Sequence, residues 1–233
     1  DNVAVGQGAL SADTLGSRSV AIGKDALFDQ NFTTATSAYN VAVGYSAGAN
    51  VTTGVRNNFI GGLAGFTTTS GGNNVAIGLS ALEGNTVGSR SIAIGSNALA
   101  VQNPSTATDM YNVAIGDNAG NDVTTGTLNT FVGNRSGQDM TTGGSNTLLG
   151  GYDGNQSSLD LRAEDSNIVL STGGGVPLLW ARLTGTHVHS QTTALATAFV
   201  SAINSTNASS QLIRGANSAS NINDISATQF VVF

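Results

Sequence analysis

The sequence predicts an all-β protein built as a parallel β-solenoid, and three observations lead to this prediction. A five-residue unit of the form Asn-Val-Ala-Val-Gly recurs nine times. Its closing glycines are separated by 17, 21, 17, 17, 17, 21, 17 and 17 residues, so a 17-residue period lies within a 72-residue period. Each unit is also short, rich in β-branched residues and apolar. A fixed period of this kind is typical of stacked coils. The nine units occupy residues 2–6, 19–23, 40–44, 57–61, 74–78, 91–95, 112–116, 129–133 and 146–150.

The repeated unit is apolar on both of its alternating faces. A half-buried strand alternates apolar with polar residues, whereas a strand covered on both faces reads as a continuous apolar run. One face can fill the interior of its own coil, and the other needs a second layer that a thin coil does not possess. We therefore expect further copies of the same chain to supply that layer. The residues predicted to form this shared core are Val75, Ala76, Ile77, Ile92, Ala93 and Ile94.

Positions that recur at a fixed spacing in each coil support the same fold. Asn or Ser stands four residues before every closing glycine, where stacked side chains can form a hydrogen-bond ladder. Alanine stands three residues after the glycine in the first seven copies, as close stacking requires, and the last two copies have Ser136 and Asp153 there. The solenoid is therefore expected to end near residue 154. The predicted divisions are a repeat domain (1–154), a β-hairpin connector (155–185) and a C-terminal tip (186–233).

The pattern N-[SV]-V-A-I-G-x-x-[AS] resembles the head repeat of YadA-like trimeric adhesins and related repeats in phage tail fibres. The resemblance covers roughly residues 1–154 through its nine copies. It implies a homotrimer whose chains form a left-handed parallel β-roll of about nine coils. A small β-rich tip with one short helix is expected to follow the roll.

Composition narrows the possible functions. Only 9% of the residues are charged, the formal net charge is −6, and the eight basic residues are scattered, so nucleic-acid binding is not expected. The chain has no cysteine, which excludes a disulfide scaffold. No apolar run reaches the length of a membrane span, so membrane insertion is not expected. The chain begins inside a repeat without a signal peptide, which indicates a fragment of a longer protein.

Two coils are four residues longer than the others, with insertions within residues 28–39 and 100–111. Insertions in solenoids map to surface loops, often on the binding face. Phe32 and Asn103 are therefore candidate receptor contacts. The alternative interpretation makes both insertions structural corners, anchored by the tyrosine that recurs at the end of each.

Two further features recur with the 72-residue period. The position four residues after the glycine reads Leu, Leu, Gly, Gly, and the fourth coil carries Phe59 or Phe131 where the other coils have a small central residue. Packing complementarity between coils is the expected reason. Arg18 and Arg90 lie in a recurring Gly-Ser-Arg-Ser, where we expect a salt bridge or a ladder contact on the solvated face.

The pattern changes after residue 155. Strands are predicted at 159–162, 167–172 and 176–183, with a glycine turn between the last two. Trp180 is expected in the core rather than as a sugar-stacking platform. Residues 192–203 predict a short amphipathic helix. The polar stretch 204–221 is predicted to be an adaptable receptor-binding loop at the tip; its candidate contacts are Asn204, Asn207, Asn217 and Asn221.

The only two histidines, His187 and His189, are two residues apart, so on a strand they point to the same side. Three chains around an axis would offer six imidazoles, which suits iron(II), or nickel or cobalt as substitutes, better than tetrahedral zinc. This His-x-His pattern resembles the metal-bearing motif of T-even long tail fibre tips. The alternative is two solvated histidines on an exposed strand.

These features favour the receptor-binding part of a phage tail fibre, located in the virion and joined to other tail-fibre segments. Its partner would be a glycan or an outer-membrane protein on a bacterial surface. The first alternative is the passenger head of a trimeric autotransporter adhesin on the bacterial cell surface. The second is a polysaccharide depolymerase, which needs paired carboxylates. The chain has two glutamates, and its aspartates mostly fall in turns, so we do not expect an enzyme.

Overall fold

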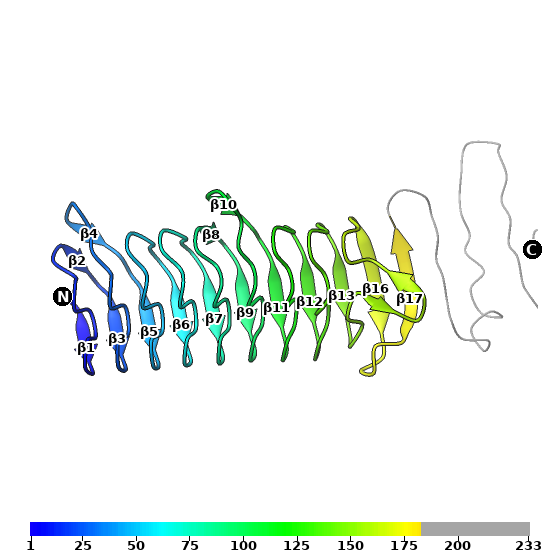
Figure 1. The fold of residues 1–233 in the computed structure, drawn as a ribbon, viewed down its shortest axis with the longest axis horizontal. Coiled ribbons are helices and arrows are strands. Elements are labelled where there is room, and N and C mark those ends of the chain that lie inside the picture. The colour runs from blue at the N-terminus through cyan, green and yellow to red at the C-terminus, as the bar shows by residue number, and fades with distance from the viewer. Residues whose placement is uncertain (183–233) are drawn as a thin grey trace, which may run out of the picture. The chain divides into compact units, whose positions relative to one another are not determined.

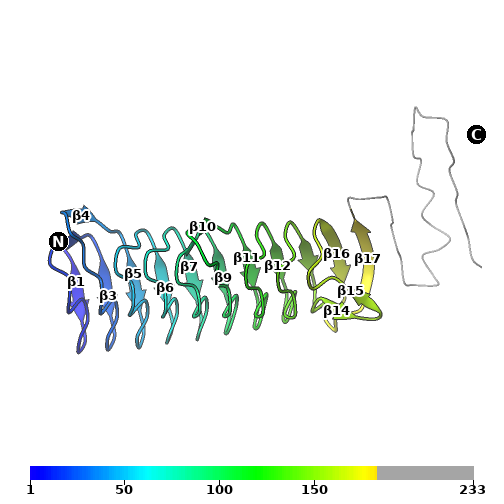
Figure 2. The ribbon, with the colours of Figure 1, turned by 45° about the horizontal axis from the view of Figure 1, so that its top comes forward.

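The computed structural model describes residues 1–182, which form an all-β parallel solenoid (Figure 1). Ten parallel strands stack in one sheet, and Figure 2 shows the same row of strands from a second direction. We call these strands rungs 1–10. They are Val3–Val5 (β1), Val20–Ile22 (β3), Val41–Val43 (β5), Asn58–Ile60 (β6), Val75–Ile77 (β7), Ile92–Ile94 (β9), Val113–Ile115 (β11), Thr130–Val132 (β12), Thr147–Leu149 (β13) and Asn167–Ser171 (β16).

Each rung pairs with the next in register, so equivalent residues form columns along the stack. Ala42 pairs with Phe59, and Phe59 pairs with Ala76. Successive side chains of a strand point to opposite faces, and the central residue of each rung points into its own coil. These central residues are completely buried from rung 2 onward: Ala21, Ala42, Phe59, Ala76, Ala93, Ala114, Phe131, Leu148 and Val169.

This register corrects part of the predicted shared core. Ala76 and Ala93 have no exposed surface within a single chain, so they cannot contact a second chain. The first and third residues of the same two rungs, Val75 and Ile77, and Ile92 and Ile94, lie on the outer face. The side chains available to another copy are therefore these four and their equivalents on the other rungs.

A ladder of asparagine side chains joins the rungs at one corner, as predicted. The Oδ1 atom of Asn57 accepts the backbone N–H of Asn74 at 3.0 Å, while its Nδ2 donates to the carbonyl of Gly71 at 2.9 Å. Equivalent backbone bonds link Asn2, Asn40, Asn74, Asn112, Asn129 and Asn146 to the rung that follows each of them. These bonds satisfy groups that are buried and would otherwise cost free energy.

The two long coils keep the ladder continuous with a buried glutamine. Ser19 is too short to reach the next rung, and Gln30 takes over that connection. The Gln30 Nε2 donates to Ser19 Oγ at 3.3 Å, and its Oε1 accepts from Asn40 Nδ2 at 2.8 Å. Gln102 occupies the same position 72 residues later, where it bridges Ser91 and Asn112. The Asn-to-Ser change and the longer coil are thus structurally linked.

The alternation of large and small residues packs the interior, as predicted. Phe59 is completely buried, and the positions beside its ring are glycines. A β-carbon at Gly48 would lie 2.7 Å from the ring, and one at Gly65 would lie 2.5 Å from it. Both distances are too short for any side chain. Phe131 makes the same fit with Gly120 and Gly137.

The parallel stack continues past residue 154, where the sequence predicted its end. Rung 10 pairs with rung 9 in parallel, and the backbone N–H of Asn167 bonds to Asn146 Oδ1 at 2.9 Å. Pro177–Arg182 (β17) then pairs with rung 10 antiparallel. Trp180 packs against the core, as predicted, and its indole N–H donates to Asn167 Oδ1 at 3.1 Å. It therefore takes the place of the next rung at the end of the ladder.

Short two-residue strands complete the described chain. Gly16–Ser17 (β2) pairs in parallel with Thr36–Ser37 (β4), and Gly88–Ser89 (β8) pairs with Thr108–Asp109 (β10) in the same way. Asn155–Gln156 (β14) and Leu159–Asp160 (β15) form a small antiparallel pair. The first two pairs arise from the two insertions.

Several predictions lie outside the described residues. These are the helix over 192–203, the tip from 186 to 233 and both histidines. No helix within residues 1–182 has the length and apolar character needed to cross a membrane.

Candidate interaction surfaces

The outer face of the rungs, whose strands form the row in Figure 1, carries a continuous column of aliphatic side chains. The third residue of each of rungs 1–9 belongs to it, together with Leu170, which pairs with Leu149 in rung 10. These residues are Val5, Ile22, Val43, Ile60, Ile77, Ile94, Ile115, Val132, Leu149 and Leu170. Eight of these ten are between 36% and 57% exposed. The first residues of the rungs add a parallel, mostly aliphatic column. We call these two columns together the outer apolar face.

The outer apolar face is larger and more regular than the scattered apolar residues found on most protein surfaces. Rungs lie about 4.8 Å apart, so ten of them extend over roughly 43 Å. Turns and loops of the same chain cover the inner faces of the rungs but leave this face in water.

The two insertions differ in what they expose. Phe32 is only 7% exposed, so it packs inside the loop and is not available as a receptor contact. Asn103 is exposed, but its Oδ1 already accepts from Thr86 Oγ1 at 2.6 Å. The recurring tyrosines, Tyr39 and Tyr111, are about half exposed rather than buried as anchors. The exposed aromatic residues of these insertions are thus Phe28 and the two tyrosines that the alternative interpretation assigned to packing.

Arginine side chains cover both of these tyrosines. The Arg18 guanidinium lies 5.3 Å from the centre of the Tyr39 ring and donates a hydrogen bond to its hydroxyl. Arg90 lies 5.7 Å from the Tyr111 ring and pairs with Asp109 at 2.9 Å, which confirms the predicted salt bridge at this position. Cation–π contacts of this kind are worth about 0.5–1 kcal/mol when exposed.

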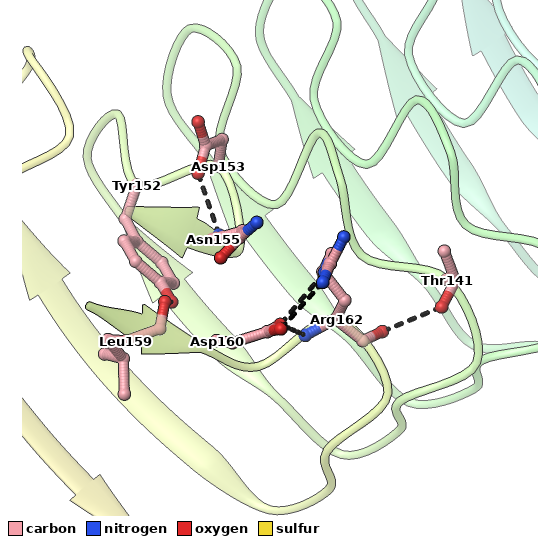
Figure 3. A network of polar contacts seen from close by, with 7 residues as sticks. All are labelled: Thr141, Tyr152, Asp153, Asn155, Leu159, Asp160 and Arg162. Atoms are coloured by element: carbon pink, nitrogen blue, oxygen red, sulfur yellow. Dashed lines mark hydrogen bonds and ion pairs between the residues drawn. The ribbon is translucent and has the colours of Figure 1, made fainter. Parts of the chain in front are cut away.

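A polar network lies beside the small β14–β15 pair (Figure 3). Arg162 donates to both carboxylate oxygens of Asp160, at 3.0 and 2.8 Å, and its carbonyl accepts from Thr141 Oγ1 at 3.0 Å. Tyr152 donates its hydroxyl to the carbonyl of Leu159 at 2.7 Å. An open depression here is lined by Thr141, Asp160, Arg162, Ala163 and Glu164.

The pKa values of two carboxyl groups near this depression are shifted in opposite directions. Hydrogen bonds from Arg162 lower the pKa of Asp160. Burial raises the pKa of Asp139, and the neighbouring charges of Asp153 and Asp122 raise it further. Burial also raises the pKa of Tyr152. The ion pair holds Asp160 as an anion beside its own arginine, and because both side chains are about half exposed it contributes little to stability.

The remaining predicted sites lie outside the part of the chain that is described. They are the candidate metal ligands His187 and His189 and the tip asparagines Asn204, Asn207, Asn217 and Asn221. Within residues 1–182, no group of three or more histidine, cysteine, aspartate or glutamate side chains is placed to hold a metal ion. Comparisons of the chain with known protein families, with characterised proteins and with solved structures found no match.

Proposed function

We propose that this protein is a structural and host-attaching part of a phage tail fibre, in which three copies of the chain pack their outer apolar faces together. The observation that carries this proposal is the outer apolar face itself. It runs along all ten rungs without interruption by a charged residue. Removing apolar surface from water contributes about 25 cal/mol per Å², so a surface of this length favours association.

A second copy of the chain is the partner that fits this surface best. The apolar side chains repeat once per rung, at the strand spacing of about 4.8 Å. A partner with the same repeat can match every rung, whereas a partner with another fold would match only some of them. Three copies around an axis let each face meet two others, which agrees with the trimer that the adhesin-like repeat implies.

A rod of this kind suits attachment at a distance from the particle. In this proposal the rod is part of the virion and joins other tail-fibre segments, while the tip (186–233) contacts a bacterial surface glycan or outer-membrane protein. A metal on the trimer axis, held by His187 and His189, would fasten the chains near the tip. The alternative of an adhesin passenger head on a bacterial surface uses the same rod and the same apolar face.

Binding to bacterial cells tests the attachment function. The fluorescently labelled 233-residue chain is added to a panel of bacterial strains, and the bound fraction is measured as the protein concentration increases. We expect saturable binding to some strains and loss of binding after deletion of residues 204–221, with the rod intact by circular dichroism. Absence of saturable binding to every strain, or equal binding by the deletion variant, would contradict this assignment.

A further inference from the structure

The edge at which each rung begins carries one exposed residue per rung, five positions before the closing glycine. We call this series the corner column. From rung 2 to rung 9 its members are Arg18, Tyr39, Arg56, Asn73, Arg90, Tyr111, Leu128 and Ser145. All eight have positive φ angles, between 52° and 63°. All eight are also exposed.

This backbone conformation is unfavourable for the bulky members of the column. Asn adopts positive φ readily, whereas larger side chains do so at a cost. Leu27 and Leu82 have similar φ angles, 49° and 55°, but their burial in the core offsets that cost. Arg18 and Arg56 gain no such burial. Exposed Leu128 has the same conformation, with a φ of 61°, so the charge of the arginines and not their backbone distinguishes rungs 2 to 4.

Rungs 2 to 4 concentrate positive charge in this column. Arg18 lies against the Tyr39 ring, and Arg56 follows one rung beyond Tyr39, about 10 Å from Arg18 along the stack. Asp1 holds the same position in rung 1, and its carbonyl accepts the backbone N–H of Arg18 at 2.8 Å, but no carboxylate among residues 1–182 forms an ion pair with Arg18 or Arg56. Two guanidinium groups without an ion-pair partner, on a chain with a net charge of −6, form a local site for an anion.

The second 72-residue repeat provides an internal comparison on the same backbone. Arg90 and Tyr111 reproduce the stacked pair, but Asp109 neutralises the arginine, and the first repeat has Ser37 in that place. Leu128 occupies the position equivalent to Arg56. The fold therefore accepts a neutralised version of the column, and the charge at rungs 2 to 4 is not required for folding.

The opposite edge of the same rungs carries a further basic side chain, which is paired with a carboxylate. Lys24 follows the end of rung 2 and lies 5.8 Å from the Tyr45 ring, with Asp25 at 3.8 Å. In a trimer whose strand faces turn toward a common axis, the beginning of each strand lies beside the end of the same strand in the next copy. The Lys24–Asp25 pair of one copy then lies beside the corner column of its neighbour and brings a hydrogen-bond donor but no net charge, a step that rests on the proposed function.

We propose that Arg18, Tyr39 and Arg56 form a binding site on the side of the rod for the carboxylate groups of an acidic polysaccharide. A guanidinium group matches a carboxylate in bidentate geometry, and an exposed tyrosine offers an edge and a hydroxyl group to a sugar ring. Nucleic acid does not fit, because it requires more clustered basic residues than this column holds. The site is distinct from the tip and lets the rod lie along a surface polymer.

Titration calorimetry of the 233-residue chain, with polygalacturonate as the carboxylated probe and dextran as the neutral probe, tests the site. We expect binding of polygalacturonate, weakened by added salt, and no binding of dextran. The double variant Ser37→Asp, Arg56→Leu introduces only residues that the second repeat already has, and should bind at least about tenfold more weakly. The control variant Arg90→Gln, at the equivalent position of the second repeat, should bind as the wild type does.

Two results would overturn the proposal: a wild type that does not bind polygalacturonate, and a double variant that binds it as tightly as the wild type. Circular dichroism of the same samples shows whether each variant is folded. Mass measurement separates this inference from the proposed function. A trimer that ignores polygalacturonate refutes only the side site, whereas a monomer that binds it refutes only the trimer and the contribution of Lys24.

Discussion

Replacement of Phe59 by alanine tests the packing that holds the coils together. The side chain is completely buried, and its neighbours on both sides are glycines with no side chain to move into the space. Removing a buried phenylalanine costs about 3–5 kcal/mol, and the cost is highest where the site cannot collapse. We therefore expect a loss near the upper end of that range. The assay is urea unfolding followed by circular dichroism, at one fixed chain concentration because assembly contributes to stability.

A second substitution should rescue this variant. Rung 5 combines Ala76 with Leu82, and Leu82 has a φ angle of 55°, close to the 60° of Gly65. The double variant Phe59→Ala, Gly65→Leu copies that arrangement into rung 4. We expect it to recover about 2 kcal/mol of the loss, while Gly65→Leu alone destabilises the protein because its β-carbon would lie 2.5 Å from the Phe59 ring.

The equivalent positions of the second repeat provide the control. Phe131→Ala should behave as Phe59→Ala does, and adding Gly137→Leu should rescue it. If the two losses simply add in the double variants, the two positions do not share one space, and the account of large and small residues filling a common interior is wrong.

The other predictions concern the outer face, the end cap, titration and metal. Ile77→Asp should abolish assembly and leave the coil folded. The control variant Thr125→Asp, on an exposed bend, should leave the mass of the assembly in solution unchanged. Trp180→Phe should lower the free energy of unfolding by about 1–2 kcal/mol, because it leaves the last acceptor of the ladder unpaired. The raised pKa of Asp139 means that its charged form opposes folding above the usual carboxyl pKa, so Asp139→Asn should stabilise the protein at pH 7, and the gain should disappear in unfolding measurements at low pH. Elemental analysis of the purified protein should find about one metal ion per three chains, and a variant lacking both histidines should have none.

The fold was accessible from the sequence because its signal repeats. The glycine spacing predicted the rungs, the asparagine column predicted the ladder, and the two-faced apolar strands predicted an exposed face. The direction of each side chain was not accessible in the same way, since a three-residue strand that is apolar throughout does not show which residue points inward. Ala76 was therefore assigned to a shared core although it fills its own coil.

Two other features were missed for identifiable reasons. Rung 10 lacks the closing glycine, because Ser171 takes its place, although Asn167 follows Asn146 by the 21 residues that also separate the ladder positions across the long coils. Gln30 looked like an ordinary residue of an insertion, and only its recurrence 72 residues later as Gln102 marked it as part of the ladder. In both cases the spacing indicated the structural role, while the residue type differed from the one expected at that position.

The mass that the 233-residue chain has in solution tests the central claim most directly. Multi-angle light scattering after size-exclusion chromatography measures it without assumptions about shape. Association through the outer apolar face predicts three times the chain mass of 23.3 kDa, and the mass of one chain for Ile77→Asp. A wild-type protein that has the mass of a single chain at micromolar concentration would contradict the claim that copies of the chain cover this face.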